Sequence, residues 1–97
     1  MQVYLIIIGK TATGYSAHCP DVPGCAAVGD TVEQAVASMR GALEFHFEGM
    51  LEDGEPIPLP RGMAAYSEAM QDLEVDREFP AHVRIDSTRQ AGALSPV

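Results

Sequence analysis

Apolar residues occupy nearly every position from Gln2 to Ile8. Side chains alternate between the two faces of a β-strand, so both faces of a strand formed here would be apolar. One face would carry Val3, Leu5 and Ile7, and the other would carry Tyr4, Ile6 and Ile8. This pattern predicts a central strand that is covered on both sides, with the second cover supplied by a helix or by another subunit.

Two short strands are predicted next, on either side of a proline-rich loop. The strands span residues 15–19 and 25–28, and the loop spans Pro20–Gly24. The two loop prolines fix φ, and the glycine permits a turn geometry that other residues rarely adopt. Three strands joined by short turns predict an antiparallel meander.

The longest periodic segment starts after Gly29. Asp30 can cap a helix there, and Glu33 stands three residues later, which is the spacing of a capping box. Apolar residues then recur at steps of three or four, at Val32, Val36, Met39, Leu43, Phe47 and Met50. Gly54 and the prolines that follow end the pattern. The segment is therefore predicted to be an α-helix whose apolar face covers the sheet.

A second helix over 62–73 and a fourth strand over Phe79 to Asp86 complete the expected elements. In that strand Ala81, Val83 and Ile85 would point inward. We therefore expect an α+β fold of order β-β-β-α-(α)-β, with the main helix packed on the sheet and the strands in the order 3-2-1-4. The crossover through the long helix would let the last strand lie parallel to the first. Residues 1–86 would form one domain and 87–97 a flexible tail.

The charge balance is strongly acidic, with six Lys and Arg against fourteen Asp and Glu and a formal net charge of -8. Such a surface repels phosphate, so direct binding of nucleic acid is not expected, whereas a basic protein would be attracted. Five acidic residues and no Lys or Arg fall within 44–55. Glu44, Glu48 and Glu52 share one helix face, and they are our candidate contacts for a basic partner. The alternatives are that this face is only solvated and that the acidity only maintains solubility.

No set of residues predicts catalysis, and no metal or cofactor is expected. His18, Cys19, Asp21 and Cys25 form the one cluster of metal-ligating residue types, but Cys-x5-Cys is not a usual zinc spacing. We expect the two cysteines to be small buried hydrophobes. His46 is interpreted as a packing or interface residue. The first strand carries no inward carboxylate, which argues against two-metal nuclease chemistry.

Three motifs together resemble the HicB antitoxin family. They are YSAHCPDVPGC at 15–25, GDTVEQA at 29–35 and EGMLEDGEPIP at 48–58, and the resemblance covers about residues 2–60 with a looser match at 79–86. It implies a degenerate RNase H-like fold and a homo-oligomer, either a dimer or a tetramer. It also implies a function: members block a small basic RNA-cleaving HicA-type toxin by direct contact.

The chain departs from many members of that family after Asp86, where no helical apolar pattern predicts a C-terminal DNA-binding segment. This departure keeps a second hypothesis open, that of a stand-alone homo-oligomeric regulatory or structural module without a toxin partner. Both hypotheses place the protein in the cytoplasm. The first apolar run is too short for a signal peptide or a membrane span, and the two cysteines suit a reducing compartment.

Overall fold

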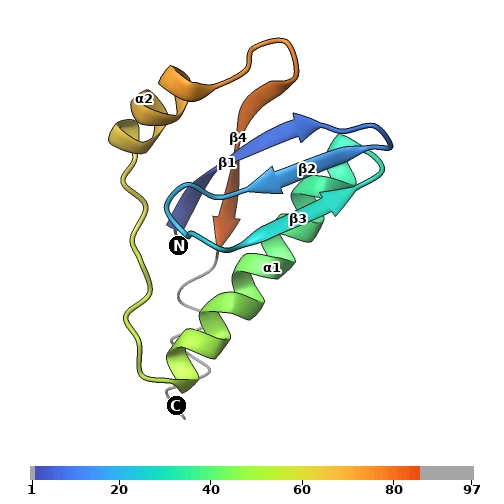
Figure 1. Ribbon diagram of the computed structural model, residues 1–97. Coiled ribbons are helices and arrows are strands. Elements are labelled where there is room, and N and C mark those ends of the chain that lie inside the picture. Colours follow the sequence, from blue (N-terminus) through green and yellow to red (C-terminus); the bar gives the residue numbers. More distant parts are fainter. Residues whose placement is uncertain (1, 86–97) are drawn as a thin grey trace.

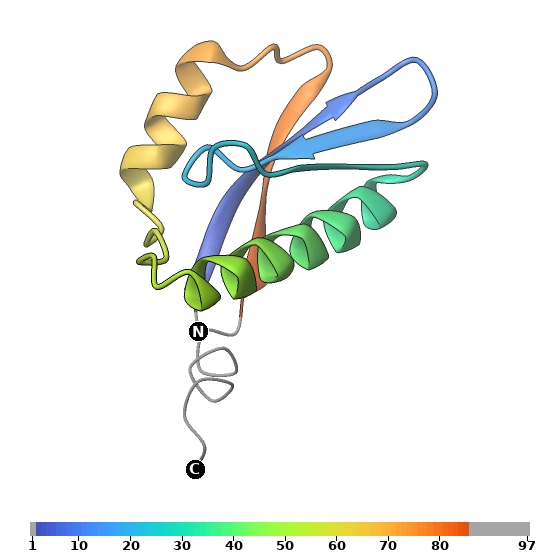
Figure 2. The same ribbon diagram turned by 60° about the horizontal axis from the view of Figure 1, so that its bottom comes forward.

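A four-stranded sheet lies between two helices (Figures 1 and 2). The computed structural model describes residues 2–85, so Asp86 and the expected tail at 87–97 lie outside the described residues. The elements are β1 (Gln2–Lys10), β2 (Tyr15–His18), β3 (Ala26–Gly29), α1 (Val32–Glu52), α2 (Met63–Asp72) and β4 (Glu78–Ile85). Their order along the chain is the one that the sequence predicts.

The strands are arranged β3-β2-β1-β4, which is the expected order. The expected direction of β4 is wrong, because β4 runs antiparallel to β1, with Ile85 opposite Gln2 and Glu78 opposite Gly9. Two passes over the sheet explain the difference. α1 carries the chain along one face, and the following segment and α2 bring it back along the other (Figure 2). The chain therefore enters β4 at the end where β1 leaves off, and the Lys10 N–H donates to the Arg77 carbonyl there at 2.8 Å.

The N-terminal cap of α1 lies one residue later than predicted. Thr31 is extended, and its hydroxyl accepts a hydrogen bond from the Gln34 N–H at 3.1 Å. The Gln34 side-chain oxygen accepts in turn from the Asp30 N–H at 2.9 Å. The predicted pair of Asp30 and Glu33 is thus replaced by a pair with the same three-residue spacing. Each pair satisfies two amides at the helix start in the same way, so local sequence alone allowed either register.

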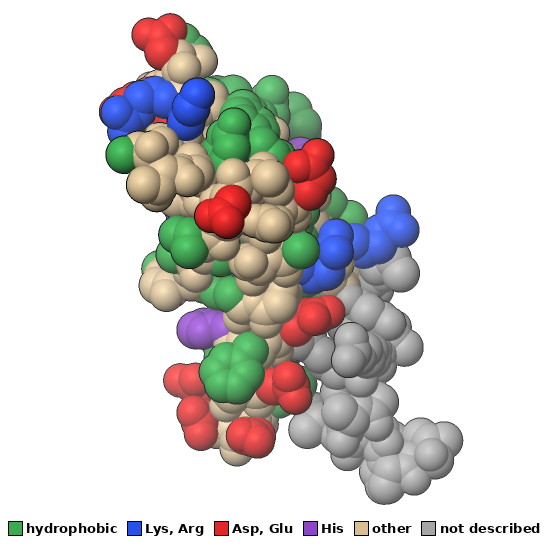
Figure 3. Space-filling view, turned by 90° about the vertical axis from the view of Figure 1, so that its right-hand side faces the viewer, with side chains coloured by type: hydrophobic (Ala, Val, Ile, Leu, Met, Phe, Trp, Pro, Cys, Tyr) green, Lys and Arg blue, Asp and Glu red, His purple; other side chains and the backbone are tan. Residues whose placement is uncertain are grey.

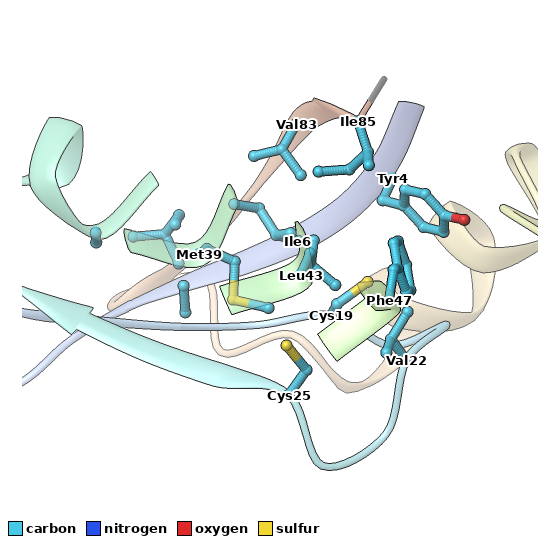
Figure 4. Packing of buried hydrophobic residues seen from close by; sticks show 13 residues of the cluster. Tyr4, Ile6, Cys19, Val22, Cys25, Met39, Leu43, Phe47, Val83 and Ile85 are labelled. Atoms are coloured by element: carbon cyan, nitrogen blue, oxygen red, sulfur yellow. The ribbon is translucent and has the colours of Figure 1, made fainter. Parts of the chain in front are cut away.

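The main core lies between α1 and one face of the sheet (Figure 4). Tyr4 and Ile6 point into it from β1, and Met39, Leu43 and Phe47 point into it from α1, all with no exposed surface. The rings of Tyr4 and Phe47 lie 5.3 Å apart. The periodicity of α1 is confirmed at these positions, while Val36 and Met50 pack at the margin of the same core.

The opposite face of β1 is covered by α2. Leu5 and Ile7 are buried there against Ala65, and Tyr66 and Leu73 complete the contact. The second cover of the first strand is therefore the second helix. On β4, the predicted alternation is confirmed within the described residues, with Val83 and Ile85 buried and His82 and Arg84 exposed.

The loop Pro20–Gly24 holds in place the segment that connects α1 to α2. Asp21 accepts two hydrogen bonds from Arg61, one from its backbone N–H at 2.9 Å and one from its Nε. The Asp21 side chain is only 3% exposed, and the same guanidinium also pairs with Glu68 of α2 at 3.1 Å. Nearby, the Tyr4 hydroxyl donates to the Pro58 carbonyl. The loop therefore fixes where the proline segment runs and where α2 begins.

Candidate interaction surface

The predicted contact residues lie on the C-terminal half of α1. Glu48 and Glu52 are exposed and Glu44 is half-buried. Their four-residue spacing places them on one helix face, which we call the acidic ridge. Asp53 and Glu55 follow at the helix end, and Figure 3 shows acidic side chains gathered there around a hydrophobic one. This end of the molecule is thus an exposed, negatively charged surface.

The charges at the end of α1 oppose the stability of the helix. The C-terminus of a helix carries a partial negative charge, so each carboxylate in the last turn is unfavourable, by roughly 0.3–1 kcal/mol when exposed. The last turn of α1 holds Glu52 and no basic residue. Glu48 and Glu52 also repel each other at i, i+4. Folding alone does not explain why acidic residues gather here.

An exposed aromatic residue, Phe45, stands beside the acidic ridge. Its side chain is 79% exposed, although the neighbouring Phe47 is fully buried. Sequence reasoning did not single it out, because the helical spacing drew attention to the buried face. The available signal was that Phe45 falls two residues from both Leu43 and Phe47, which puts it on the opposite side of the helix.

A hollow lies next to Phe45, between α1 and the loop that precedes β3. Phe45, His46 and Gly49 line it on the helix side, and Gly24 and Cys25 line it on the loop side. His46 is half-buried, with its ring 6.3 Å from that of Phe47. The surface around Phe45 is therefore uneven, with a projecting ring beside a recess.

Three of the four residues of the metal-like cluster serve structural roles, and the fourth, His18, is exposed on β2. Cys19 and Cys25 are free thiols in the main core, as predicted, and Asp21 is engaged by Arg61. Burial raises the pKa of Cys19 to about 11 and also raises the pKa of Cys25. Both thiols stay protonated near neutral pH, which makes them poor nucleophiles and poor metal ligands. Within residues 2–85, no three His, Cys, Asp or Glu side chains are grouped so as to hold a metal ion.

Comparison with known proteins identifies the family. Residues 4–93 match the model of the HicB-like antitoxin of bacterial toxin-antitoxin systems. The chain belongs to the HicB-like antitoxin family. Among curated relatives, an uncharacterized 14.9 kDa protein of Haemophilus phage HP1 is 44% identical over 65 residues, which cover 67% of this chain and 49% of that protein. Antitoxin HicB 1 of Photorhabdus laumondii is 45% identical over 47 residues, covering 48% of this chain and 30% of the relative.

Solved HicB structures share the fold. The Burkholderia pseudomallei antitoxin HicB superimposes with a TM-score of 0.75 at 25% identity, over 89% of this chain and 64% of that one. A chain of the HicA3 and HicB3 toxin-antitoxin complex gives a TM-score of 0.70 at 27% identity, over 88% of this chain and 99% of that one. The chain spans about half the length of the phage relative. No helix within residues 2–85 has the length and apolar character needed to cross a membrane.

Proposed function

We propose that this HicB-like protein is an antitoxin that neutralises a small, basic, RNA-cleaving HicA-type toxin by direct contact, with no catalytic activity of its own. Its family and its likeness to a chain of the HicA3 and HicB3 complex support a toxin as partner. We also propose that its fold is a degenerate RNase H-like fold, as the resemblance to the family implies. We further propose that residues 1–86 act as one domain, in a cytoplasmic homo-oligomer that does not itself bind nucleic acid.

The observation that carries this proposal is the acidic end of α1. From Gly41 to Pro60 the chain holds five acidic residues and no Lys or Arg. A basic toxin would be steered to such a surface, and its positive charges would offset the repulsion within the acidic ridge. Glu44, Glu48 and Glu52 are the proposed contact residues.

The first test is recovery of the partner. The full protein is tagged in its native host and purified gently at low salt, and the proteins that accompany it are identified. We expect a small basic protein that elutes as the salt concentration is raised, and whose RNA-cleaving activity is blocked when the tagged protein is added back. Recovery of the protein alone, as a stable oligomer under several growth conditions, would overturn the proposal in favour of the stand-alone module.

The second test reverses the charge of the acidic ridge. Glu44, Glu48 and Glu52 are changed together to Lys, and association with the recovered partner is followed at several salt concentrations. Because steering depends on these charges, we expect slower association and a weaker dependence on salt. The matched control makes the same net change at 72, 74 and 76, at the last residue of α2 and just after it. Equal effects of the two triple variants would exclude the acidic ridge as the contact surface.

A further inference from the structure

Phe45 lies between two glycines along α1. Gly41, Phe45 and Gly49 follow one another at four-residue intervals, so they form a line on the side of the helix away from the core. We call this line the Phe45 ridge. It runs directly beside the acidic ridge. Residues 44, 48 and 52 follow the three members of the Phe45 ridge by three positions each, which makes them neighbours on the helix surface.

The glycines of the Phe45 ridge are not required by the fold. Glycine weakens a helix interior relative to alanine, because it gains backbone freedom when the helix unfolds. A Cβ added at Gly41 or at Gly49 would meet no atom within 4 Å. By contrast, a Cβ at Gly29 would lie 2.4 Å from the Ala35 nitrogen. Gly29 is needed for packing inside the described chain, whereas Gly41 and Gly49 only leave the helix surface flat on either side of a projecting ring.

The negative charge beside the Phe45 ridge indicates which kind of protein could bind there. In a symmetric contact between two copies, the same patch faces itself. Glu48 and Glu52 would then be brought towards the same residues of the second copy, and the repulsion would oppose association. A basic partner instead gains from the same charges. Charge complementarity therefore favours a basic protein over a second copy of this chain.

We propose that the Phe45 ridge is the apolar centre of the surface that binds the basic partner, with Phe45 inserted into an apolar pocket of that partner. This inference rests on the proposed antitoxin function and adds the anchor residue and the shape of the complementary surface. The partner carries a pocket wide enough for an aromatic ring, with Lys or Arg around its rim to meet the acidic ridge. Its backbone or small side chains approach α1 closely over Gly41 and Gly49. Buried aromatic anchors ringed by polar contacts are typical centres of protein interfaces.

The test uses the recovered basic protein, purified in a catalytically inactive form, as the probe. Its binding to the wild-type protein and to each variant is measured by surface plasmon resonance. Phe45→Ala should weaken binding about tenfold or more, mainly through faster dissociation. Phe79→Ala makes the same change at a partly exposed phenylalanine on β4 and should alter binding by less than about twofold.

The glycine variants separate binding from stability. Gly41→Ala and Gly49→Ala should each raise the melting temperature by a few degrees, because alanine favours the helix and meets no neighbour. Each should nevertheless weaken binding, by roughly three- to tenfold, because the added methyl group blocks close approach. A variant that is more stable and binds less well cannot owe its defect to unfolding.

Three other results would overturn the inference, and they can be told apart. Tight binding that Phe45→Ala leaves unchanged overturns it, while the antitoxin function stands on the wild-type result. A Phe45→Ala variant that loses only self-association, measured by light scattering, assigns the Phe45 ridge to a second copy and also overturns it. Failure of the wild-type protein to bind any basic partner overturns the proposed function and this inference together.

Discussion

The two faces of the sheet are covered to very different depths. On the α1 side, thirteen buried residues form one cluster, which draws on β1, β2, β4, the segment between β2 and β3, and a helix of 21 residues. On the α2 side, the buried cluster within residues 2–85 consists of Leu5, Ile7 and Ala65, beneath a helix of 10 residues. The burial of apolar surface is the main favourable term in folding, so the α1 side is the folding core and α2 is a thin cover.

The thin cover relies more on polar contacts. α2 begins just after Arg61, which is held by Asp21. The segment before α2 is held by the hydrogen bond that the Tyr4 hydroxyl donates to the Pro58 carbonyl. The start of α2 has no side-chain cap, unlike the start of α1. A segment with few buried contacts opens more easily than the core. The molecule thus combines a stable layer, which presents the acidic ridge, with a layer that can open locally.

The largest expected effect comes from two adjacent isoleucines that face opposite layers. Ile6 is fully buried on the α1 side, and Ile7 is 4% exposed on the α2 side. Ile6→Ala should lower the free energy of unfolding by about 4 kcal/mol, because the dense core cannot collapse into the cavity. Ile7→Ala should cost about 2 kcal/mol, because α2 can shift toward the vacated space. Urea unfolding measures both values, and equal losses would mean that the two layers are equally rigid.

The elements of this fold follow from local patterns more readily than their directions do. The doubly apolar first strand and the spacing of α1 each predicted a covered face, and both are confirmed in the described residues. The direction of β4 did not follow, because it depends on α2 returning the chain across the sheet. The Asp21–Arg61 contact joins residues forty positions apart, and no local pattern indicates it.

The candidate surface shows a similar division. Glu44, Glu48 and Glu52 could be placed on one helix face because helical spacing is regular, and their role in binding stays a prediction. Phe45 was missed because apolar residues at helical spacing are normally taken as core, and attention to that face left out a residue that lies off the spacing. Its exposure follows from its place two residues from both Leu43 and Phe47, on the opposite side of the helix. The spacing therefore separates the two nearby phenylalanines, while the contacts of the exposed one depend on a partner that the chain does not contain.

High pH should destabilise the protein through groups buried on the α1 side. The pKa of Cys19 is raised from 9.0 to about 11, so its contribution is fully present below pH 9. Between pH 9 and 11 the unfolded chain releases this proton while the folded chain keeps it, and about 2–3 kcal/mol of stability is lost. Burial raises the pKa values of Cys25 and Tyr4 in the same cluster, so both add to the decline.

Urea unfolding with a reducing agent from pH 7 to 11 measures this loss. In Cys19→Ala the decline above pH 9 should be clearly shallower than in the wild-type protein, since the group with the largest shift is gone. Cys25→Ala is the matched control in the same core and should change the slope less. A decline that is identical in all three proteins would show that Cys19 is not its source.

The smallest effect on overall stability, and the most local one, should come from Asp21→Asn. The carboxylate accepts from both the backbone N–H and Nε of Arg61, whereas an amide offers one acceptor and turns its NH2 toward a donor. We expect a loss of about 1–2 kcal/mol, felt mainly by α2. Native-state hydrogen exchange should then show the amides of Met63–Asp72 exchanging about tenfold faster, with little change in α1.

Asp76→Asn makes the same substitution at an exposed position and should leave both helices unchanged. Equal acceleration in α1 and α2 after Asp21→Asn would contradict the comparison, because it would mean that the two layers open as one cooperative unit. Acceleration confined to α2 would have a functional consequence. The acidic ridge and Phe45 would then keep their geometry while α2 opens, so the proposed binding surface would depend on the folding core alone.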